Sequence, residues 1–96
     1  MYFLYLLYNI ETEKYYVGFT SNINKRLKEH QSGLNQSTKY KCCAWKLIYT
    51  EIYKAKQDAI IRENKLKAHG SGLVEIKKRI LHSLKLIKLK TGEGKR

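Results

Sequence analysis

The chain has 96 residues, the size of one small domain, and its 43% hydrophobic content argues against a disordered chain. No run of about 18 apolar residues occurs, and the first residues lack the basic segment and small-residue cleavage site of a signal peptide, so we expect a cytoplasmic protein with no membrane partner. A formal net charge of +12 indicates a polyanionic partner, most simply nucleic acid.

Two short runs of aromatic and aliphatic residues begin the chain. Residues 2–8 (YFLYLLY) and 15–20 (YYVGFT) have the length and composition of strands, and the polar link between them predicts a β-hairpin. The first run is apolar at every position, which predicts a strand that is covered on both faces. Strand alternation places Tyr5 on one face and Leu4 and Leu6 on the other.

After the hairpin the pattern becomes helical. Ser21 is a candidate N-cap, and Ser32 and Gly33 supply a stop signal, so the sequence predicts a helix of about three turns. Residues 34–44 show no period and are expected to form a loop. Residues 45–53 (WKLIYTEIY) predict a third strand.

Two further helical patterns complete the chain. Residues 55–68 predict a helix that Gly70 ends. From Ser71 onward, a stripe of leucines and isoleucines predicts one last amphipathic helix. The order ββαβαα predicts an α+β domain with a small, three-stranded, largely antiparallel sheet flanked by helices. We expect this domain to span residues 1–83, and residues 84–96 to form a basic tail in which the last helix ends and frays.

Several residues of these elements are unusual for their positions. Gly18 lies inside an aromatic strand, which is costly unless another group must approach the backbone. Arg26 and His30 lie four residues apart and share a helix face. Glu63 lies on the apolar side of its helix, where a carboxylate needs a partner. Taken alone, Glu63 is better explained by a surface ion pair with Lys67.

In their order and spacing these residues resemble the GIY-YIG nuclease family, most closely its small, stand-alone branch of single-domain proteins. The GIY element reads Phe3-Leu4-Tyr5, and the YIG element reads Tyr16-Val17-Gly18. Residues 24–30 look like the arginine helix of the family, 45–49 like its third strand and 59–67 like its glutamate helix. Each motif is weak alone, but the set is specific and covers most of the chain.

The resemblance implies a metal-dependent endonuclease that hydrolyses phosphodiester bonds of DNA or a structured nucleic acid with one divalent ion, Mg²⁺ or Mn²⁺. It implies catalytic roles for Tyr5, Tyr16, Arg26, His30 and Glu63, with Glu63 as the metal ligand. One carboxylate can suffice, because Mg²⁺ keeps several of its waters. Arg26 would pair with phosphate, and Tyr16 or Tyr5 would be the general base, of which we favour Tyr16. His30 would assist the base or bind phosphate.

The basic residues are expected to contact nucleic acid both around this site and on the last helix. Residues 77–96 hold eight Lys and Arg against one Glu, a local net charge of +7. A solvated, frayed end is the alternative interpretation of that charge. The expected contacts are Gly18, Lys25, Arg26, Lys28, Lys67, Lys85 and Lys88.

Three departures from the family and two alternative functions stay open. The terminal asparagine of the larger family members has no obvious counterpart in this chain. Phe3 replaces the glycine of the GIY element, and Phe19 stands where the excision-repair nucleases of the family carry a basic residue. The chain could instead be a basic nucleic-acid-binding module with the same fold and no catalysis, for which Glu63 would be dispensable. It could also dock its last helix on a protein partner, which the sequence does not identify. Strand tyrosines such as Tyr5 and Tyr16 are in most proteins core residues.

Overall fold

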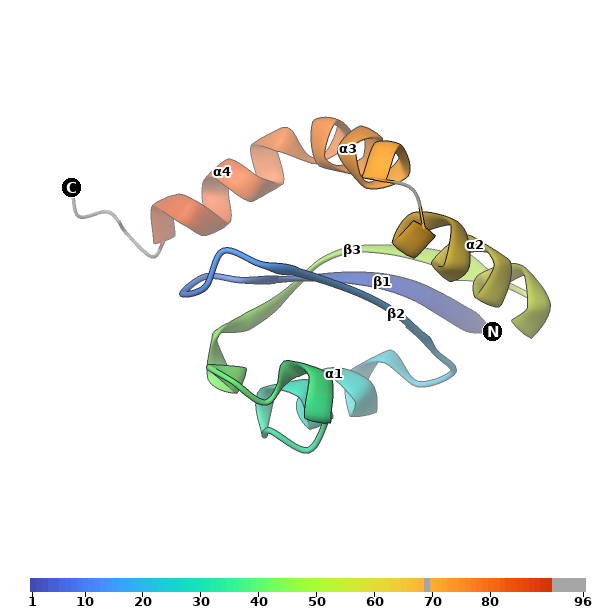
Figure 1. The fold of residues 1–96 in the computed structure, drawn as a ribbon, viewed down its shortest axis with the longest axis horizontal. Helices are drawn as coiled ribbons and strands as arrows, with labels where there is room; N and C mark the ends of the chain where they lie inside the picture. Colours follow the sequence, from blue (N-terminus) through green and yellow to red (C-terminus); the bar gives the residue numbers. More distant parts are fainter. Residues whose placement is uncertain (69, 91–96) are drawn as a thin grey trace.

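The computed structural model describes residues 1–68 and 70–90. Its centre is an antiparallel sheet of three strands in the order β2-β1-β3 (Figure 1). The strands are β1 (Tyr2–Asn9), β2 (Tyr15–Thr20) and β3 (Trp45–Tyr53). The predicted hairpin, third strand and α+β class are confirmed, and the first strand takes the central position that its continuous apolar run requires.

Helices cover both faces of the sheet. Helix α1 (Ile23–Gln31) lies on one side, whereas α2 (Lys56–Ala68), α3 (Gly70–Arg79) and α4 (Leu81–Lys90) lie on the other (Figure 1). The loop predicted over residues 34–44 contains two single turns of 3₁₀ helix. None of the helices in the described ranges is long and apolar enough to cross a membrane.

Two distinct clusters of side chains fill the two layers. On the side of α2 and α3, Leu4 and Leu6 of β1 pack with Leu66 and Ile76. On the side of α1, the buried cluster is formed by Tyr5, Leu7 and Trp45. The alternation predicted for β1 is therefore confirmed, and it delivers an aliphatic core to one face and an aromatic, partly polar one to the other.

The ends of two helices differ from the sequence prediction. The N-cap of α1 is Asn22 rather than Ser21, because the Asn22 side chain accepts a hydrogen bond from the backbone N–H of Lys25 at 3.0 Å. Ser32 is the C-cap, as predicted, and Gly33 follows with a φ of +82°. Gly70 does not end a helix but begins α3.

The single last helix predicted from Ser71 is in fact two helices, α3 and α4, which meet at Ile80. Hydrogen bonds from the Ile80 N–H to Ile76 and from the Leu84 N–H to Ile80 bridge the junction, so the chain bends there without opening into a loop. The bend lets both Ile76 and Leu84 be buried. Residues 91–96 of the predicted tail lie outside the described residues, and the division at residue 83 stays a prediction.

Candidate active site

Tyr5 and His30 form the buried centre of the layer between the sheet and α1. Tyr5 is 1% exposed and His30 is fully buried. The Tyr5 hydroxyl lies 2.7 Å from His30 Nε2, a hydrogen bond that joins β1 to the last turn of α1. Two polar side chains can be buried here because each satisfies the other.

The second nitrogen of His30 is held by a residue that the sequence did not single out. His30 Nδ1 lies 2.6 Å from Thr38 Oγ1, and Thr38 is itself buried. The indole N–H of Trp45 donates to the Thr38 carbonyl at 3.0 Å and anchors this part of the loop. Because both ring nitrogens are engaged, the imidazole cannot rotate without losing two hydrogen bonds. Thr38 lies in a loop without periodicity, so no pattern pointed to it.

Tyr16 and Gly18 complete the aromatic side of the cluster. The Tyr16 ring centroid lies 4.9 Å from that of His30 and 6.3 Å from that of Tyr5. Gly18 pairs with Tyr5 across the hairpin, and a Cβ added to it would lie 2.5 Å from the Tyr5 hydroxyl oxygen. The glycine therefore makes room for the phenol, which explains its place in an aromatic strand. Gly18 is buried, so it shapes the site and does not face solvent.

The surroundings shift the proton affinities of the Tyr5–His30 pair in opposite directions. Burial raises the pKa of Tyr5 to about 12, with Tyr16 and Glu63 acting in the same sense and Arg26 against it. Burial also lowers the pKa of His30, and the neighbouring guanidinium of Arg26 adds to that effect. At neutral pH the pair is therefore an uncharged phenol and a neutral imidazole.

Arg26 lies on α1, four residues before His30. Its Nε forms an ion pair with Glu29 at 3.1 Å, and both side chains are about one-third exposed. The same guanidinium influences the pKa values of both Tyr5 and His30. Arg26 thus combines partial exposure to solvent with an electrostatic effect on the buried pair.

Glu63 lies on α2, which is on the other side of the sheet from α1 and packs against β2 (Figure 1). Its carboxylate is 16% exposed and pairs with Lys67 Nζ at 3.0 Å. That ammonium group lies 5.7 Å from the Tyr16 ring centroid, and the charge of Glu63 raises the pKa of Tyr5. The ion pair considered in the sequence analysis exists, but it is partly buried and adjoins the tyrosines.

The carboxylate chemistry suits an ion that needs few protein ligands. In the described part of the chain, no three or more His, Cys, Asp or Glu side chains form a group that could hold a metal. A closed cage of the zinc or calcium type is therefore not formed by those residues. A single carboxylate such as Glu63, completed by water and substrate phosphate, is a coordination that Mg²⁺ accepts.

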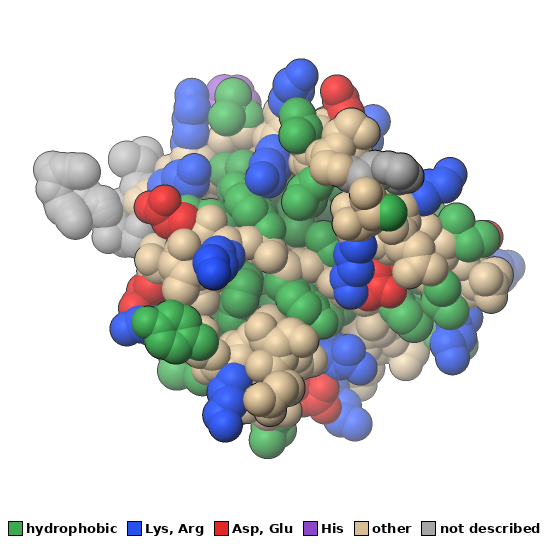
Figure 2. All heavy atoms as spheres, in the orientation of Figure 1, with side chains coloured by type: hydrophobic (Ala, Val, Ile, Leu, Met, Phe, Trp, Pro, Cys, Tyr) green, Lys and Arg blue, Asp and Glu red, His purple; other side chains and the backbone are tan. Residues whose placement is uncertain are grey.

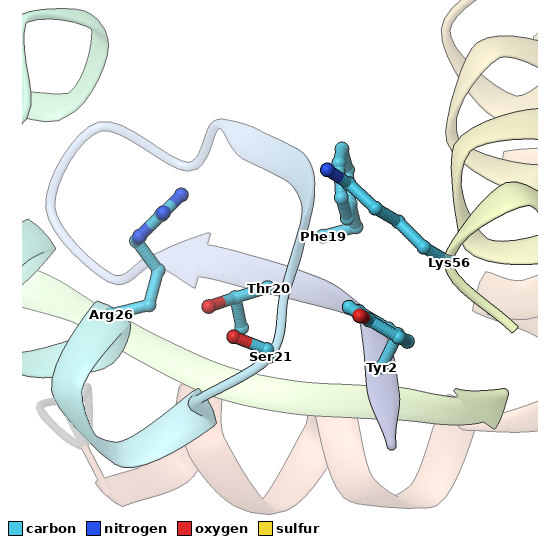
Figure 3. A pocket seen from close by; sticks show the side chains of 6 residues that line it. All are labelled: Tyr2, Phe19, Thr20, Ser21, Arg26 and Lys56. Carbon is cyan, nitrogen blue, oxygen red and sulfur yellow. The ribbon is translucent and has the colours of Figure 1, made fainter. Parts of the chain in front are cut away.

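Beside Arg26 is a pocket of about 450 Å³, at the point where β2 ends. Arg26 and Lys56 stand on opposite sides of it, and the hydroxyl groups of Thr20 and Ser21 point into the space near Arg26 (Figure 3). Lys56 is the first residue of α2 and was not predicted as a site residue, because an exposed lysine at a helix start gives no distinctive signal. The full lining is Tyr2, Phe19, Thr20, Ser21, Arg26 and Lys56.

The remaining residues predicted to bind nucleic acid are not gathered on one face. Lys25 and Lys28 are exposed on α1, whereas Lys85 and Lys88 are exposed on α4, across the sheet. Lys88 Nζ also lies 5.6 Å from the ring centroid of Tyr8. Lysine and arginine side chains are spread over both layers in Figure 2. Among the residues that the structure describes, basic side chains thus lie on both sides of the sheet as well as on the last helix.

Comparison with known proteins agrees with this architecture. A family model described as the GIY-YIG catalytic domain matches residues 1–72, the part that contains the cluster, Arg26 and Glu63. The chain is 34% identical over 93 residues to a UPF0213 protein of Limosilactobacillus reuteri (strain DSM 20016), a match that covers 93% of each chain. No solved structure shows a significant match. The chain therefore belongs to the GIY-YIG family, as the resemblance of its motifs predicted.

Proposed function

We propose that this protein is a metal-dependent endonuclease that hydrolyses phosphodiester bonds of DNA. Membership of the GIY-YIG family indicates a nuclease-type function, and the finer assignment rests on one observation. The Tyr5 phenol of β1 is hydrogen-bonded to His30 of α1 at 2.7 Å and adjoins the Tyr16 ring of β2, and the opposite charges of Arg26 and Glu63 shift its pKa in opposite directions. An aliphatic core would not require this arrangement.

Arg26 is the residue we assign to phosphate. A guanidinium can form two parallel hydrogen bonds to phosphate oxygens and matches the charge that develops on them in the transition state. Arg26 is held beside the tyrosines by α1 and is partly exposed, so a phosphate can reach it. Its ion pair with Glu29 is a weak, solvent-screened contact that a phosphate can replace.

Tyr16 is the residue we assign to the removal of a proton from the attacking water. Its side chain is partly exposed, whereas Tyr5 is buried and its hydroxyl is engaged by His30. In this assignment Tyr5, His30 and Thr38 act as a hydrogen-bonded support that holds the floor of the site. Tyr16 needs nearby positive charge to act near neutral pH, because an unperturbed phenol has a pKa of about 10.

Glu63 is the residue we assign to the divalent ion. When bound there, the ion would polarise the phosphate and stabilise the leaving oxygen. Lys67 already balances this carboxylate, and that ion pair favours a second candidate function, a binding module without catalysis. The net charge of +12 and the basic residues on both layers support nucleic-acid binding in either case.

The test compares nicking of supercoiled and branched DNA by the wild type and by Glu63→Ala, with Mg²⁺ or Mn²⁺ and with a chelator as control. We expect the variant to cleave at least about a hundredfold more slowly. Its DNA affinity should hold or rise, because a negative charge near phosphate is removed. Glu75→Ala is the matched control, since Glu75 is exposed on α3 and only weakly paired with Lys78 at 4.0 Å.

Two outcomes would contradict the enzyme assignment. One is the absence of metal-dependent nicking by the wild type on duplex, branched and single-stranded DNA. The other is a Glu63→Ala variant that cleaves as fast as the wild type. If DNA binding persists in either case, the non-catalytic module takes the place of the endonuclease.

A further inference from the structure

The pocket at the end of β2 has two chemically different sides. The side chains of Arg26 and Lys56 enter from α1 and α2, and the rings of Phe19 and Tyr2 line the space below and beside Lys56 (Figure 3). Its volume of about 450 Å³ is within the range of pockets that bind small ligands. It has features that a single nucleotide requires, namely cations and hydroxyls for a phosphate and aromatic faces for a base.

We propose that this pocket binds one unpaired nucleotide of the DNA strand, with the phosphate between Arg26 and Lys56 and the base against Phe19. This site would make single-stranded extensions and branches the preferred substrates over an intact duplex. The proposal rests on the proposed function, because Arg26 joins the pocket to the candidate active site.

The aromatic side of the pocket is set by the register of the hairpin. Phe19 pairs with Leu4, and Gly18 pairs with Tyr5, so neighbouring residues of β2 face opposite layers. Phe19 therefore directs its ring away from the tyrosine–histidine layer and toward the layer of α2. Both Phe19 and Tyr2 are only half-buried, which leaves aromatic surface accessible to a base. Stacking on an aromatic side chain is independent of base identity, because every base has a π face.

The polar side of the pocket is set by the chain reversal after β2. Thr20 is the last residue of β2, and Ser21 follows it just before α1 begins. The Thr20 hydroxyl receives a hydrogen bond from the Asn22 N–H at 3.1 Å, which fixes the turn under Arg26. Two cations and a serine hydroxyl around one space match the charge and hydrogen-bonding capacity of a phosphodiester.

A base in an intact duplex cannot enter such a pocket without leaving its stack. Extrusion of a paired base costs a few kcal/mol, whereas a base in a single strand is already accessible. A cationic, aromatic pocket on the strand path therefore discriminates by pairing state and not by sequence.

The test is a binding measurement in chelator, where no metal-dependent cleavage occurs. The probes are a blunt DNA duplex and the same duplex with a single-stranded extension that carries the fluorescent adenine analogue 2-aminopurine. We expect the full-length protein to bind the extended duplex about tenfold more tightly and to quench the analogue by stacking. Phe19→Leu should abolish both the preference and the quenching, and Phe19→Tyr should retain them.

A second pair of variants tests the proposed phosphate-binding side of the pocket and leaves the residues of β2 unchanged. Lys56→Gln should weaken binding of the extended duplex and reduce the slope of affinity against salt. Lys54→Gln is the matched control, because Lys54 is also exposed but does not line the pocket. It should leave the preference for the extension intact.

The outcomes separate the pocket from the enzyme assignment. Equal affinity for the two probes, absence of quenching, or a Phe19→Leu variant that behaves like the wild type would overturn the pocket proposal and leave the endonuclease standing. A preserved preference for the extension with no metal-dependent nicking on any substrate would support the pocket and contradict the endonuclease. Absence of binding to both probes at low salt would also overturn the pocket proposal, and the nicking assay would then decide the enzyme assignment by itself.

Discussion

Two partly buried polar clusters lie on opposite faces of the sheet, and they differ in how completely they are satisfied. On the side of α2, the Glu51 cluster consists of Glu51, Tyr49, Tyr53 and Arg62. The Glu51 carboxylate accepts hydrogen bonds from both tyrosine hydroxyls at 2.6 Å and from Arg62 at 2.9 and 3.0 Å. On the side of α1, the tyrosine–histidine cluster consists of Tyr5, Tyr16, His30 and Thr38.

The Glu51 cluster is complete within the protein. Burial alone would raise the pKa of Glu51, but hydrogen bonds from Arg62, Tyr49 and Tyr53 outweigh it and lower that pKa. The carboxylate has four donors, so it has little remaining capacity for a metal or substrate. We infer that this cluster fastens α2 to β3 and thereby fixes the helix that carries the neighbouring residue Glu63.

The tyrosine–histidine cluster is complete only at its centre. His30 is satisfied on both nitrogens, whereas Arg26 and Glu63 at its margin form partly exposed ion pairs with Glu29 and Lys67, respectively. Such groups can exchange their protein partners for a substrate or an ion at low cost. We infer from this difference that incomplete satisfaction by protein groups, more than burial or charge, distinguishes the carboxylate and the arginine that we propose for catalysis.

The largest expected contrast is between the two arginines. Arg26→Ala should slow cleavage by about a hundredfold or more and weaken DNA binding, because it removes a phosphate contact and transition-state stabilisation. Its effect on the free energy of unfolding should be below about 1 kcal/mol. Arg62→Ala should instead cost about 2 kcal/mol of stability by leaving Glu51 without its charged partner. Urea unfolding and nicking assays on both variants measure this contrast. A large loss of stability in Arg26→Ala, or a large loss of cleavage in folded Arg62→Ala, would refute it.

The tyrosines provide a second contrast. Tyr16→Phe should reduce the cleavage rate by about a hundredfold with the fold intact, since it removes the proposed base. Tyr5→Phe should reduce the rate less, because the Tyr5 hydroxyl only positions His30 through a hydrogen bond to Nε2. Tyr53→Phe should leave the rate unchanged and cost about 2 kcal/mol of stability, because it removes one hydrogen bond to a charged carboxylate. Single-turnover rates beside thermal melts check this order, and a larger loss for Tyr5→Phe would move the base to Tyr5.

A smaller effect is expected at Thr38. Thr38→Val keeps the shape of the side chain but removes the hydroxyl that holds His30 Nδ1, and we expect about a tenfold lower rate. Thr38→Ser should restore the rate. The ¹⁵N chemical shifts of the His30 ring distinguish positioning from general loosening. These chemical shifts should indicate a changed tautomer, or a changed mixture of tautomers, in Thr38→Val only. Unaltered shifts together with a lower rate would contradict the positioning role of Thr38.

The smallest effect concerns acid stability, in which the two clusters act in different pH windows. The folded-state pKa values of His30 and Glu51 are both below their ordinary values of 6.5 and 4.5, so the unfolded chain binds protons first as the pH falls. The contribution of His30 to stability should decline from near pH 6.5 downward, and that of Glu51 only below about pH 4.5. Unfolding free energies measured across this range should fall in both windows. Glu51→Gln should remove the decline in stability below about pH 4.5. A rise in stability on acidification from neutral pH would contradict both assignments.

Most of the fold could be predicted from the sequence because local patterns determine it. The strands are short runs of aromatic and aliphatic residues, and α1 has both an apolar period and a stop signal at Ser32 and Gly33. The bend at Ile80 could not be predicted, since the stripe of leucines and isoleucines continues through it. Only packing against the sheet divides that stripe into α3 and α4.

Only those residues of the candidate site that belong to the spaced family motifs could be predicted from the sequence. Tyr5, Tyr16, Arg26, His30 and Glu63 were singled out by their order, and the structure brings the first four together with the charge of Glu63 acting on them. Thr38 and Lys56 were missed because their importance depends on a loop conformation and on the meeting of α2 with β2. Neither arrangement produces a periodic pattern in the amino-acid sequence.

Glu63 and Glu51 are bound by different numbers of protein groups, so they test directly whether the incompletely satisfied carboxylate is the reactive one. Glu63→Gln and Glu51→Gln make the same chemical change, and both metal-dependent nicking and the free energy of unfolding should be measured for each. We predict that Glu63→Gln loses cleavage by at least about a hundredfold and keeps its stability within about 1 kcal/mol. Glu51→Gln should lose about 2 kcal/mol and cleave normally at a temperature at which it is folded. Normal cleavage by Glu63→Gln, or lost cleavage by a folded Glu51→Gln, would contradict the account.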